Sequence, residues 1–271
     1  MVLHLNLQLF WSPTAKDSVK AARQMNLNIP SFRSAIAEQI ASLALLFCLL
    51  FFSAHTAAEI PLFSAEYRLA RGAIPIATVN LSLQRHDEGF LFESKTEPVA
   101  PLSWIREDLV IEQSVWHYHN QLPRPTHYRY KRSNRNSLHE VEVRFDWDKQ
   151  TLHTTTNGNS WKMALAEKTL DKAVVQLALM ESLSKGTMQN SYSVADGGRP
   201  KNYRFSATGN ELLNSELGTV KTIRINRSKA GKQSDTTLWL APRLNYLPIR
   251  IDKTRNGAVY SMTITRLSMP Q

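Results

Sequence analysis

Hydrophobic and polar positions alternate with a period of two along most of the chain after residue 58. The longest example is residues 140–148, Glu-Val-Glu-Val-Arg-Phe-Asp-Trp-Asp, in which Val141, Val143, Phe145 and Trp147 fall on one side. The same pattern recurs at 79–84, 223–225, 238–240, 249–251 and 262–264. Such alternation is typical of strands that bury one face. We therefore predict that residues 59–271 form a single β-rich domain.

Turn signals separate these stretches. Asn157-Gly158, Asp196-Gly197 and Asn256-Gly257 combine residues that tolerate positive φ angles, as tight hairpins require. Asn256-Gly257 joins the alternating segments 249–253 and 259–266, which makes this the clearest predicted hairpin.

One segment follows a helical period instead. Between Thr169 and Lys185, apolar residues recur every three to four positions, at Leu170, Val174, Leu177 and Met180. Asp171 suits the positive N-terminal end of a helix, and Gly186 can end it. We predict one amphipathic helix over 170–185.

A sheet of about ten strands with a single helix must curl to bury one face. The sequence therefore predicts a mainly β fold, a curved antiparallel sheet or partly open barrel that wraps the helix. A two-sheet sandwich is the alternative.

The first 58 residues have a different composition. An apolar run at 40–52 follows Arg33 and precedes the small-residue tract 53–58. This is the order of a secretory signal, and we predict cleavage after Ala58 and an exported, periplasmic protein. We interpret residues 1–58 as an N-terminal extension and signal peptide, with the start at Met1 or Met25. The alternative is an inner-membrane anchor formed by uncleaved residues 40–58; after cleavage no stable membrane span is expected.

The single cysteine, Cys48, lies inside this apolar run. Phe47 precedes it, whereas a lipid-modified cysteine needs a small residue there, so we do not expect lipid modification. Because Cys48 is the single cysteine, residues 59–271 contain none. This excludes a disulfide, a thiolate metal site and a thiol nucleophile in that part of the chain.

The formal net charge is +10, and residues 59–271 keep +8 because the first 58 residues hold four basic and two acidic residues. Such a charge attracts polyanions and anionic membrane surfaces. The candidate basic patch lies at 124–135 and consists of Arg124, Arg129, Lys131, Arg132 and Arg135, interleaved with Tyr128 and Tyr130. Basic and aromatic residues together can bind single-stranded nucleic acid. Export makes a lipid or an envelope component the expected partner instead of nucleic acid, and a solvated strand face is the plain alternative.

The histidines suggest a metal site only weakly. His117 and His119 share one face of a predicted strand, but no third ligand sits at a recognisable spacing. Asp146 and Asp148 fall on the outward face of their strand. No Gly-x-Ser-x-Gly elbow or glycine-rich phosphate loop occurs. We therefore predict no metal, no cofactor and no catalytic residue, and the question of an enzyme stays open with a non-enzyme favoured.

Several short stretches occur in an order that resembles the bacterial domain-of-unknown-function family 3108. They are Phe-Ser-Ala-Glu-Tyr at 63–67, Phe-Asp-Trp at 145–147, Asp-Gly-Gly-Arg at 196–199, Tyr-Arg-Phe at 203–205, Gly-Asn-Glu at 209–211, Leu-Gly at 217–218, Leu-Trp-Leu-Ala-Pro at 238–242 and Leu-Pro-Ile-Arg-Ile at 247–251. The resemblance covers nearly all of residues 60–268. It implies a β-rich, signal-bearing envelope protein, and the family has no established reaction or catalytic residues that could be transferred to this chain.

Export, the strand pattern, the helix and the missing catalytic motifs together favour a non-enzymatic periplasmic binding module for a lipid-like or envelope ligand. The residues predicted to line its concave face are Trp104, Trp116, Trp161, Val174 and Leu177. One alternative is an envelope-polymer hydrolase that uses His117 and His119 with a carboxylate. Another is a scaffold that binds an envelope protein through the basic patch. The sequence predicts neither the ligand nor the oligomeric state.

Overall fold

The computed structural model describes residues 60–101, 103, 108–197, 199–229 and 235–270. The described residues belong to one compact unit. The predicted signal peptide, its cleavage site and the alternative anchor lie outside the described residues.

The described residues form one fifteen-stranded sheet with one α-helix and one 3₁₀ turn. The strands are β1 (Phe63–Arg71), β2 (Ile74–His86), β3 (Gly89–Pro98), β4 (Leu109–His119), β5 (Leu122–Asn134), β6 (Ser137–Asp146), β7 (Thr151–Thr156), β8 (Asn159–Ala164), β9 (Leu170–Asp171), β10 (Ser191–Asp196), β11 (Arg199–Ser215), β12 (Gly218–Lys229), β13 (Thr236–Ala241), β14 (Leu247–Arg255) and β15 (Ala258–Ser268). The helix is α3 (Val174–Ser184), and the 3₁₀ turn is η1 (Pro242–Leu244).

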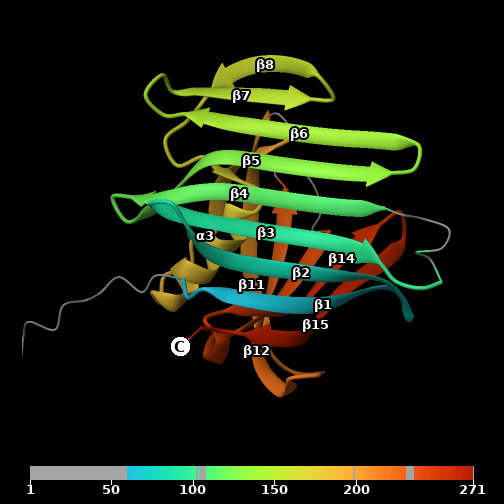
Figure 1. The fold of residues 1–271 in the computed structure, drawn as a ribbon. Helices are drawn as coiled ribbons and strands as arrows, with labels where there is room; N and C mark the ends of the chain where they lie inside the picture. The colour runs from blue at the N-terminus through green and yellow to red at the C-terminus, as the bar shows by residue number, and fades with distance from the viewer. Residues whose placement is uncertain (1–59, 102, 104–107, 198, 230–234, 271) are drawn as a thin grey trace, which may run out of the picture. The chain divides into compact units, whose positions relative to one another are not determined.

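The sheet is built outward from a central seam between its first and last strands. β1 pairs with β15, and on either side the strands follow in sequence order, to β8 at one edge and β9 at the other. All pairs are antiparallel except β9 with β10. Figure 1 shows β1 to β8 stacked as one contiguous half of the sheet.

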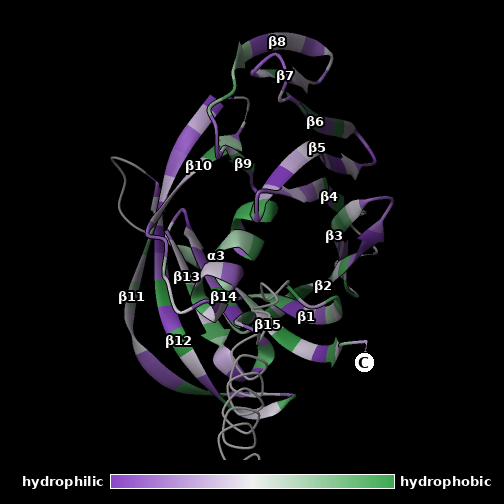
Figure 2. Cartoon of the chain, turned by 90° about the vertical axis from the view of Figure 1, so that its left-hand side faces the viewer, coloured by the Kyte–Doolittle hydropathy of each residue, from purple (hydrophilic) through white to green (hydrophobic). Residues whose placement is uncertain are grey.

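The sheet curls so that its two halves enclose helix α3 (Figure 2). The mainly β prediction of a curved sheet or partly open barrel around one helix is confirmed, and the sandwich alternative is not what forms. The parallel pair explains the helix, because parallel strands need a crossover connection and α3 is the crossover between β9 and β10.

The helix differs in two respects from the predicted one. It begins at Val174, since Leu170 and Asp171 form the short strand β9, and it is covered on most sides. Eight of its eleven residues are buried, so the buried surface of the helix extends beyond the predicted apolar stripe. Asp171 nevertheless acts at the N-terminal end as predicted, since its Oδ1 accepts hydrogen bonds from the backbone N–H groups of Ala173 and Val174, each 2.8 Å away.

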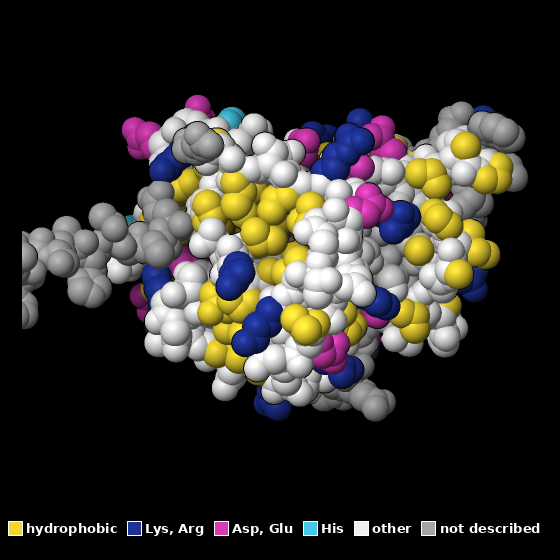
Figure 3. Space-filling view, turned by 90° about the horizontal axis from the view of Figure 1, so that it is seen from below, with side chains coloured by type: hydrophobic (Ala, Val, Ile, Leu, Met, Phe, Trp, Pro, Cys, Tyr) yellow, Lys and Arg dark blue, Asp and Glu magenta, His cyan; other side chains and the backbone are white. Residues whose placement is uncertain are grey.

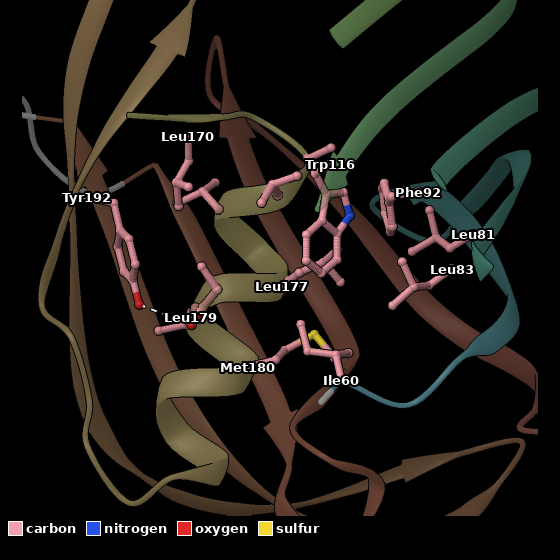
Figure 4. Close-up of a cluster of buried hydrophobic side chains, with 14 of the residues drawn as sticks. Ile60, Leu81, Leu83, Phe92, Trp116, Leu170, Leu177, Leu179, Met180 and Tyr192 are labelled. Atoms are coloured by element: carbon pink, nitrogen blue, oxygen red, sulfur yellow. Dashed lines mark hydrogen bonds between the residues drawn. The ribbon is translucent and has the colours of Figure 1, made fainter. Parts of the chain in front are cut away.

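The core lies between α3 and the inner face of the sheet. Figure 4 shows Trp116 and Leu177 pointing toward each other from β4 and α3. The ring of Trp116 stacks on Phe90 with centroids 4.5 Å apart. Large side chains of both halves of the sheet are fully buried here, among them Tyr67 and Leu240.

Two of the predicted hairpins have the expected turn geometry. Asn256 and Gly257 have φ angles of 50° and 74°, and Asn157 and Gly158 have 49° and 85°. Both turns therefore use the Asn-Gly preference for two successive positive φ angles.

The alternating segment 140–148 forms β6 only as far as Asp146. Val143 and Phe145 are buried as predicted. Trp147 is only half-buried, because it lies in the turn after the strand and its Nε1 donates to the carbonyl oxygen of Pro125, 2.6 Å away. The apolar side of this segment is therefore only partly in the core, and the ring of Trp147 packs at its margin.

Candidate functional site

Three rows of core-facing side chains end in basic residues at the same end of the sheet. The rows are Tyr67, Leu69 and Arg71 on β1; Tyr128, Tyr130 and Arg132 on β5; and Ile249, Ile251, Lys253 and Arg255 on β14. Alternate residues of a strand point to the same face. Each row therefore begins in the core and ends in a basic residue that lies on the inner side of the curled sheet.

These row ends surround a pocket of about 740 Å³, which we call the end pocket. Its apolar and aromatic lining residues are Leu69, Ile74, Ile76, Ala77, Pro98, Val110, Tyr130 and Tyr260. Its basic lining residues are Arg71, Arg132, Lys253 and Arg255, and Thr96 and Asp108 complete the described lining. The size falls within the range of small-molecule sites, which are mostly apolar with a few polar groups.

The rim of the end pocket carries more positive charge than its neighbours neutralise. Asp108 pairs with Arg132, with 3.5 Å between Oδ1 and Nη2. Within the described ranges, Arg71, Lys253 and Arg255 form no ion pair. Partial burial lowers the pKa of Lys253, and the nearby charge of Arg227 lowers it further. The rim is therefore a place where an anion would be favoured.

A polar network supports the wall behind the pocket. The hydroxyl of Tyr128 donates to Glu112 Oε1 at 2.5 Å, and Lys172 Nζ lies 3.6 Å from the same oxygen. Lys172 also lies 5.2 Å from the ring centroid of Tyr130, which lines the pocket. These contacts connect the β4–β5 wall to the segment that leads into α3.

A second network is fully buried next to it. Ser114 Oγ donates to Asp171 Oδ2 at 2.5 Å, and both residues have no exposed surface. Burial raises the pKa of Asp171 to about 6, although the hydrogen bonds from Ser114 and the helix backbone oppose the rise. Because this carboxyl is sealed in the core, we assign it a structural role at the start of α3.

Another pocket, of about 920 Å³, lies over strands β4 to β8 and is called the polar pocket here. Its lining is His117, Arg124, Glu142, Arg144, Phe145, Asp146, Trp147, Asp148, His153, Thr154, Thr155, Ser160, Trp161 and Lys162. Asp146 is hydrogen-bonded to Lys149 at 3.0 Å, and Glu142 contacts His127 at 2.8 Å.

Neither of these two carboxylates is suited to donate a proton at neutral pH. Hydrogen bonds from the backbone and side chain of Lys149 lower the pKa of Asp146. For Glu142 the largest effect is burial, which would raise the pKa, but hydrogen bonds from His127 and Arg144 outweigh it. A general acid that works near neutrality needs a raised pKa. The polar pocket therefore supports a hydrolase less well than its residue types suggest.

Of the five residues predicted to line a ligand site, the four that the structure describes do not converge on one cavity. Trp116, Val174 and Leu177 are at most 1% exposed and belong to the core. Trp161 lines the polar pocket, and Trp104 lies outside the described residues. None of the three core residues lines the end pocket or the polar pocket. A ligand-binding role for these residues stays a prediction; the structure gives Trp116, Val174 and Leu177 a packing role.

The predicted basic patch divides between the two faces of β5. On the outer face, Arg129 and Lys131 both approach Glu140 of the neighbouring strand, at 3.4 and 3.6 Å. Arg132 faces inward and lines the end pocket. Arg124 lies over the ring of Trp147, 4.4 Å from its centroid. Arg135 follows the end of β5 in the turn to β6. A uniform basic strand face is therefore not what forms.

The two strand histidines are likewise not joined by further ligands. Among the described residues, no group of three or more His, Cys, Asp or Glu side chains is placed to hold a metal ion. The pKa of His117 is lowered by burial and by the charges of Arg124 and His119, which favours the neutral ring.

Sequence reasoning missed the basic residues around the end pocket, except for Arg132. Arg71, Lys253 and Arg255 each end an alternating apolar row, and the signal that could have found them is the switch from apolar to basic within one row. That signal appears three times in the chain, on strands that are distant in sequence.

Comparison with known proteins agrees with this fold. A family model described as "Protein of unknown function (DUF3108)" matches residues 63–265. The chain belongs to the DUF3108 family. The resemblance inferred from the short sequence stretches is thus confirmed. No curated protein matches the DUF3108 chain in sequence.

One solved structure resembles this DUF3108 domain in fold. It is the crystal structure of a β-barrel-like protein of domain of unknown function DUF1849 from Brucella abortus, with a TM-score of 0.53 and 8% sequence identity. The alignment covers 79% of this chain and all of that one. At this identity the likeness concerns the fold alone.

No helix within the described part of the chain is long and apolar enough to cross a membrane. The apolar run 40–52 lies outside that part, so the predicted export and periplasmic location remain predictions.

Proposed function

We propose that residues 59–271 form a periplasmic binding module for an amphiphile with an anionic head group, whose apolar part enters the end pocket. The observation that carries the proposal is the arrangement of that pocket: apolar side chains form its walls and four basic residues stand among them. Burying hydrocarbon against such walls removes apolar surface from water. Arg and Lys form strong charge-assisted hydrogen bonds with carboxylate and phosphate.

The described lining supports binding more than catalysis. It contains no His, Ser or Cys, and its one acid, Asp108, already pairs with Arg132. Among the described residues, neither Thr96 nor Lys253 has a side-chain hydrogen bond to a base. Nucleophilic catalysis needs a nucleophile beside a base that activates it. The module is therefore proposed to hold its ligand without changing it.

The two alternatives have weaker support. An envelope-polymer hydrolase would use His117, but the pKa values of two carboxylates in its pocket, Glu142 and Asp146, are lowered and not raised. A scaffold that binds through the basic patch would have to compete with Glu140 for Arg129 and Lys131.

The test is a fluorescence titration of the full chain with cis-parinaric acid, an anionic polyene fatty acid, and with the corresponding uncharged alcohol. We expect saturable binding of the acid and weaker binding of the alcohol. The double variant Lys253→Glu/Arg255→Glu should weaken binding of the acid at least tenfold, since it reverses two charges of the rim. Lys221→Glu, an exposed position on β12 outside the end pocket, is the matched control and should bind like the wild type.

A second variant tests the cavity itself. Val110→Trp should fill the end pocket and abolish binding of both probes, while thermal melts show whether the domain remains folded. Equal affinity in the rim variant and the Lys221→Glu control would contradict the proposal. So would binding of the fatty acid that persists undiminished in a folded Val110→Trp protein.

A further inference from the structure

Three hairpin tips at the end-pocket side of the sheet expose apolar side chains. They are the tips 71–76 between β1 and β2, 131–139 between β5 and β6, and 253–260 between β14 and β15. Ile74 is 66% exposed, Leu138 54% and Val259 41%. Other large apolar side chains, such as Leu212, are exposed elsewhere, but these three stand at tips that border one pocket and carry basic residues, the arrangement expected of an interaction surface.

The three tips belong to one rim. The backbone N–H of Gly72 donates to the carbonyl oxygen of Val259 at 3.0 Å, which joins the first and third tips. Arg132, in the second tip, lines the end pocket together with Ile74 and Arg255 of the other two. Figure 1 shows the β1–β2 and β5–β6 connections on the right, and Figure 3 shows hydrophobic side chains with Lys and Arg among them at that end.

The charges of the tips all have one sign. The three segments contain six basic residues and no acidic one: Arg71, Lys131, Arg132, Arg135, Lys253 and Arg255. Asp108 and Glu140, outside the tips, pair with Arg132 and Lys131. At the opposite ends of the same strands the composition differs, since the β2–β3 turn carries Asp87 and Glu88.

We propose that these three tips dock the mouth of the end pocket on the surface of an anionic lipid bilayer, with Ile74, Leu138 and Val259 entering the interface. The inference rests on the proposed function, because docking would let an amphiphile pass directly between the bilayer and the end pocket. Interfacial binding combines buried apolar area with attraction of basic residues to anionic lipids. Each basic residue near such a surface contributes about 1 kcal/mol, or about a fivefold change in partition.

The charge also decides against a second copy of the chain as the occupant. Two copies that met through these tips would place six basic residues against six, and like charges across an interface oppose association. An anionic surface meets the same tips with complementary charge.

The experiment places an environment-sensitive fluorophore on single cysteines of the full chain. Cys48→Ser removes the only natural cysteine, and Leu138→Cys or Leu122→Cys supplies the labelling site. Leu122 is a matched control because it is 45% exposed but lies at the opposite end of β5. The label reports its own surroundings, so insertion of residues 40–52 into the vesicle does not imitate the signal.

We expect a blue shift of the label at 138 with vesicles of phosphatidylglycerol and phosphatidylcholine, little shift with phosphatidylcholine alone, and no shift at 122. Adding Val259→Asp to the 138-labelled protein should lower the apparent partition about fivefold or more, whereas Leu122→Asp should leave it unchanged. An equal response at both labels, or no response at 138 with anionic vesicles, overturns docking.

The two proposals fail separately. Val259 does not line the end pocket, so Val259→Asp should bind cis-parinaric acid in vesicle-free buffer like the wild type. Docking without fatty-acid binding would refute the proposed function, and fatty-acid binding without docking would refute only the present inference.

Discussion

Asp171 is a fully buried titratable residue whose carboxyl group accepts three hydrogen bonds. Its side chain accepts hydrogen bonds from Ser114 and from the backbone at the start of α3, yet it is completely buried. Burial destabilises the carboxylate by more than these hydrogen bonds stabilise it, and the pKa of Asp171 therefore rises to about 6 from an ordinary value of 3.8.

This shift predicts how the domain responds to pH. A raised pKa in the folded state means that the contribution of Asp171 to stability is fully present below about pH 4 and is lost as the pH rises through about 6. The loss amounts to about 3 kcal/mol. Asp171→Asn keeps the shape and the two backbone hydrogen bonds to Oδ1, and its Nδ2 can donate to Ser114 Oγ in place of the bond that Asp171 accepts. The variant removes the buried charge and should therefore be more stable than the wild type at pH 7.5. Denaturant unfolding between pH 4 and pH 8 measures this.

Asp196 supplies the opposite control. Burial would raise its pKa, but hydrogen bonds from Lys229 and Lys201 outweigh burial and lower it. Its contribution to stability is therefore present above about pH 4 and lost on acidification, so Asp196→Asn should be less stable than the wild type at pH 7.5. If both variants moved stability in the same direction at that pH, the assignment for Asp171 would be wrong.

At the scale of elements, the approach of β3 to β4 depends on Gly89. A side-chain Cβ at this position would lie 2.3 Å from the carbonyl oxygen of Trp116, a backbone atom that cannot move alone. Gly89→Ala should therefore separate the two strands locally and cost about 3 kcal/mol, the upper part of the range for overpacking.

Gly158→Ala is the comparison for this prediction. Gly158 has a φ of 85°, and a methyl group at this position would have no atom within 4 Å. The cost of the substitution is therefore only that of backbone conformation, about 1 kcal/mol. Chemical unfolding of the two variants should rank Gly89→Ala as the more destabilised. The reverse ranking would show that β3 and β4 are not held this closely.

The helix shows what a periodic pattern can and cannot predict. The spacing of Val174, Leu177 and Met180 is sufficient to predict a helix, because residues three to four positions apart share one face of a helix. All three belong to the core. The pattern could not show that Leu170 belongs to a strand, since the pairing partner, Val194, lies beyond the helix. It also could not show that Val175 and Leu179, on other sides of the helix, would be covered by the curled sheet.

At the scale of the whole domain, the order of the strands predicts where the structure opens first. β8 is an edge strand with mostly exposed side chains, whereas β1 and β15 lie at the centre of the sheet. Hydrogen exchange should therefore be fastest in β7 and β8 and slowest in β1, β2 and β15. Mass spectrometry of exchanged peptides measures this, and equal protection of β8 and β1 would contradict it.

The fold class can be predicted from the sequence, whereas the set of residues around the end pocket cannot, for one physical reason. Alternation in a strand is local and is visible in segments such as 249–251, so a curled sheet around a helix could be predicted. The convergence of Arg71, Arg132 and Lys253 depends on how far the sheet curls, and each cation alone resembles an ordinary exposed strand end. Trp116 shows the converse, because a large aromatic residue suits a ligand site and a core equally well.

The seam between β1 and β15 imposes an order in time on the folding of this chain. Thr265 Oγ1 donates to the carbonyl oxygen of Glu66, 199 positions away, whereas every other pair of neighbouring strands in the described sheet is consecutive in the chain. The first eight strands can therefore assemble as their residues become available, but β1 keeps a bare edge until the last strand arrives. A bare edge can pair with the wrong strand or with another molecule. The final residues of the sheet thus complete the structure and also end the interval in which a half-folded chain is exposed to aggregation.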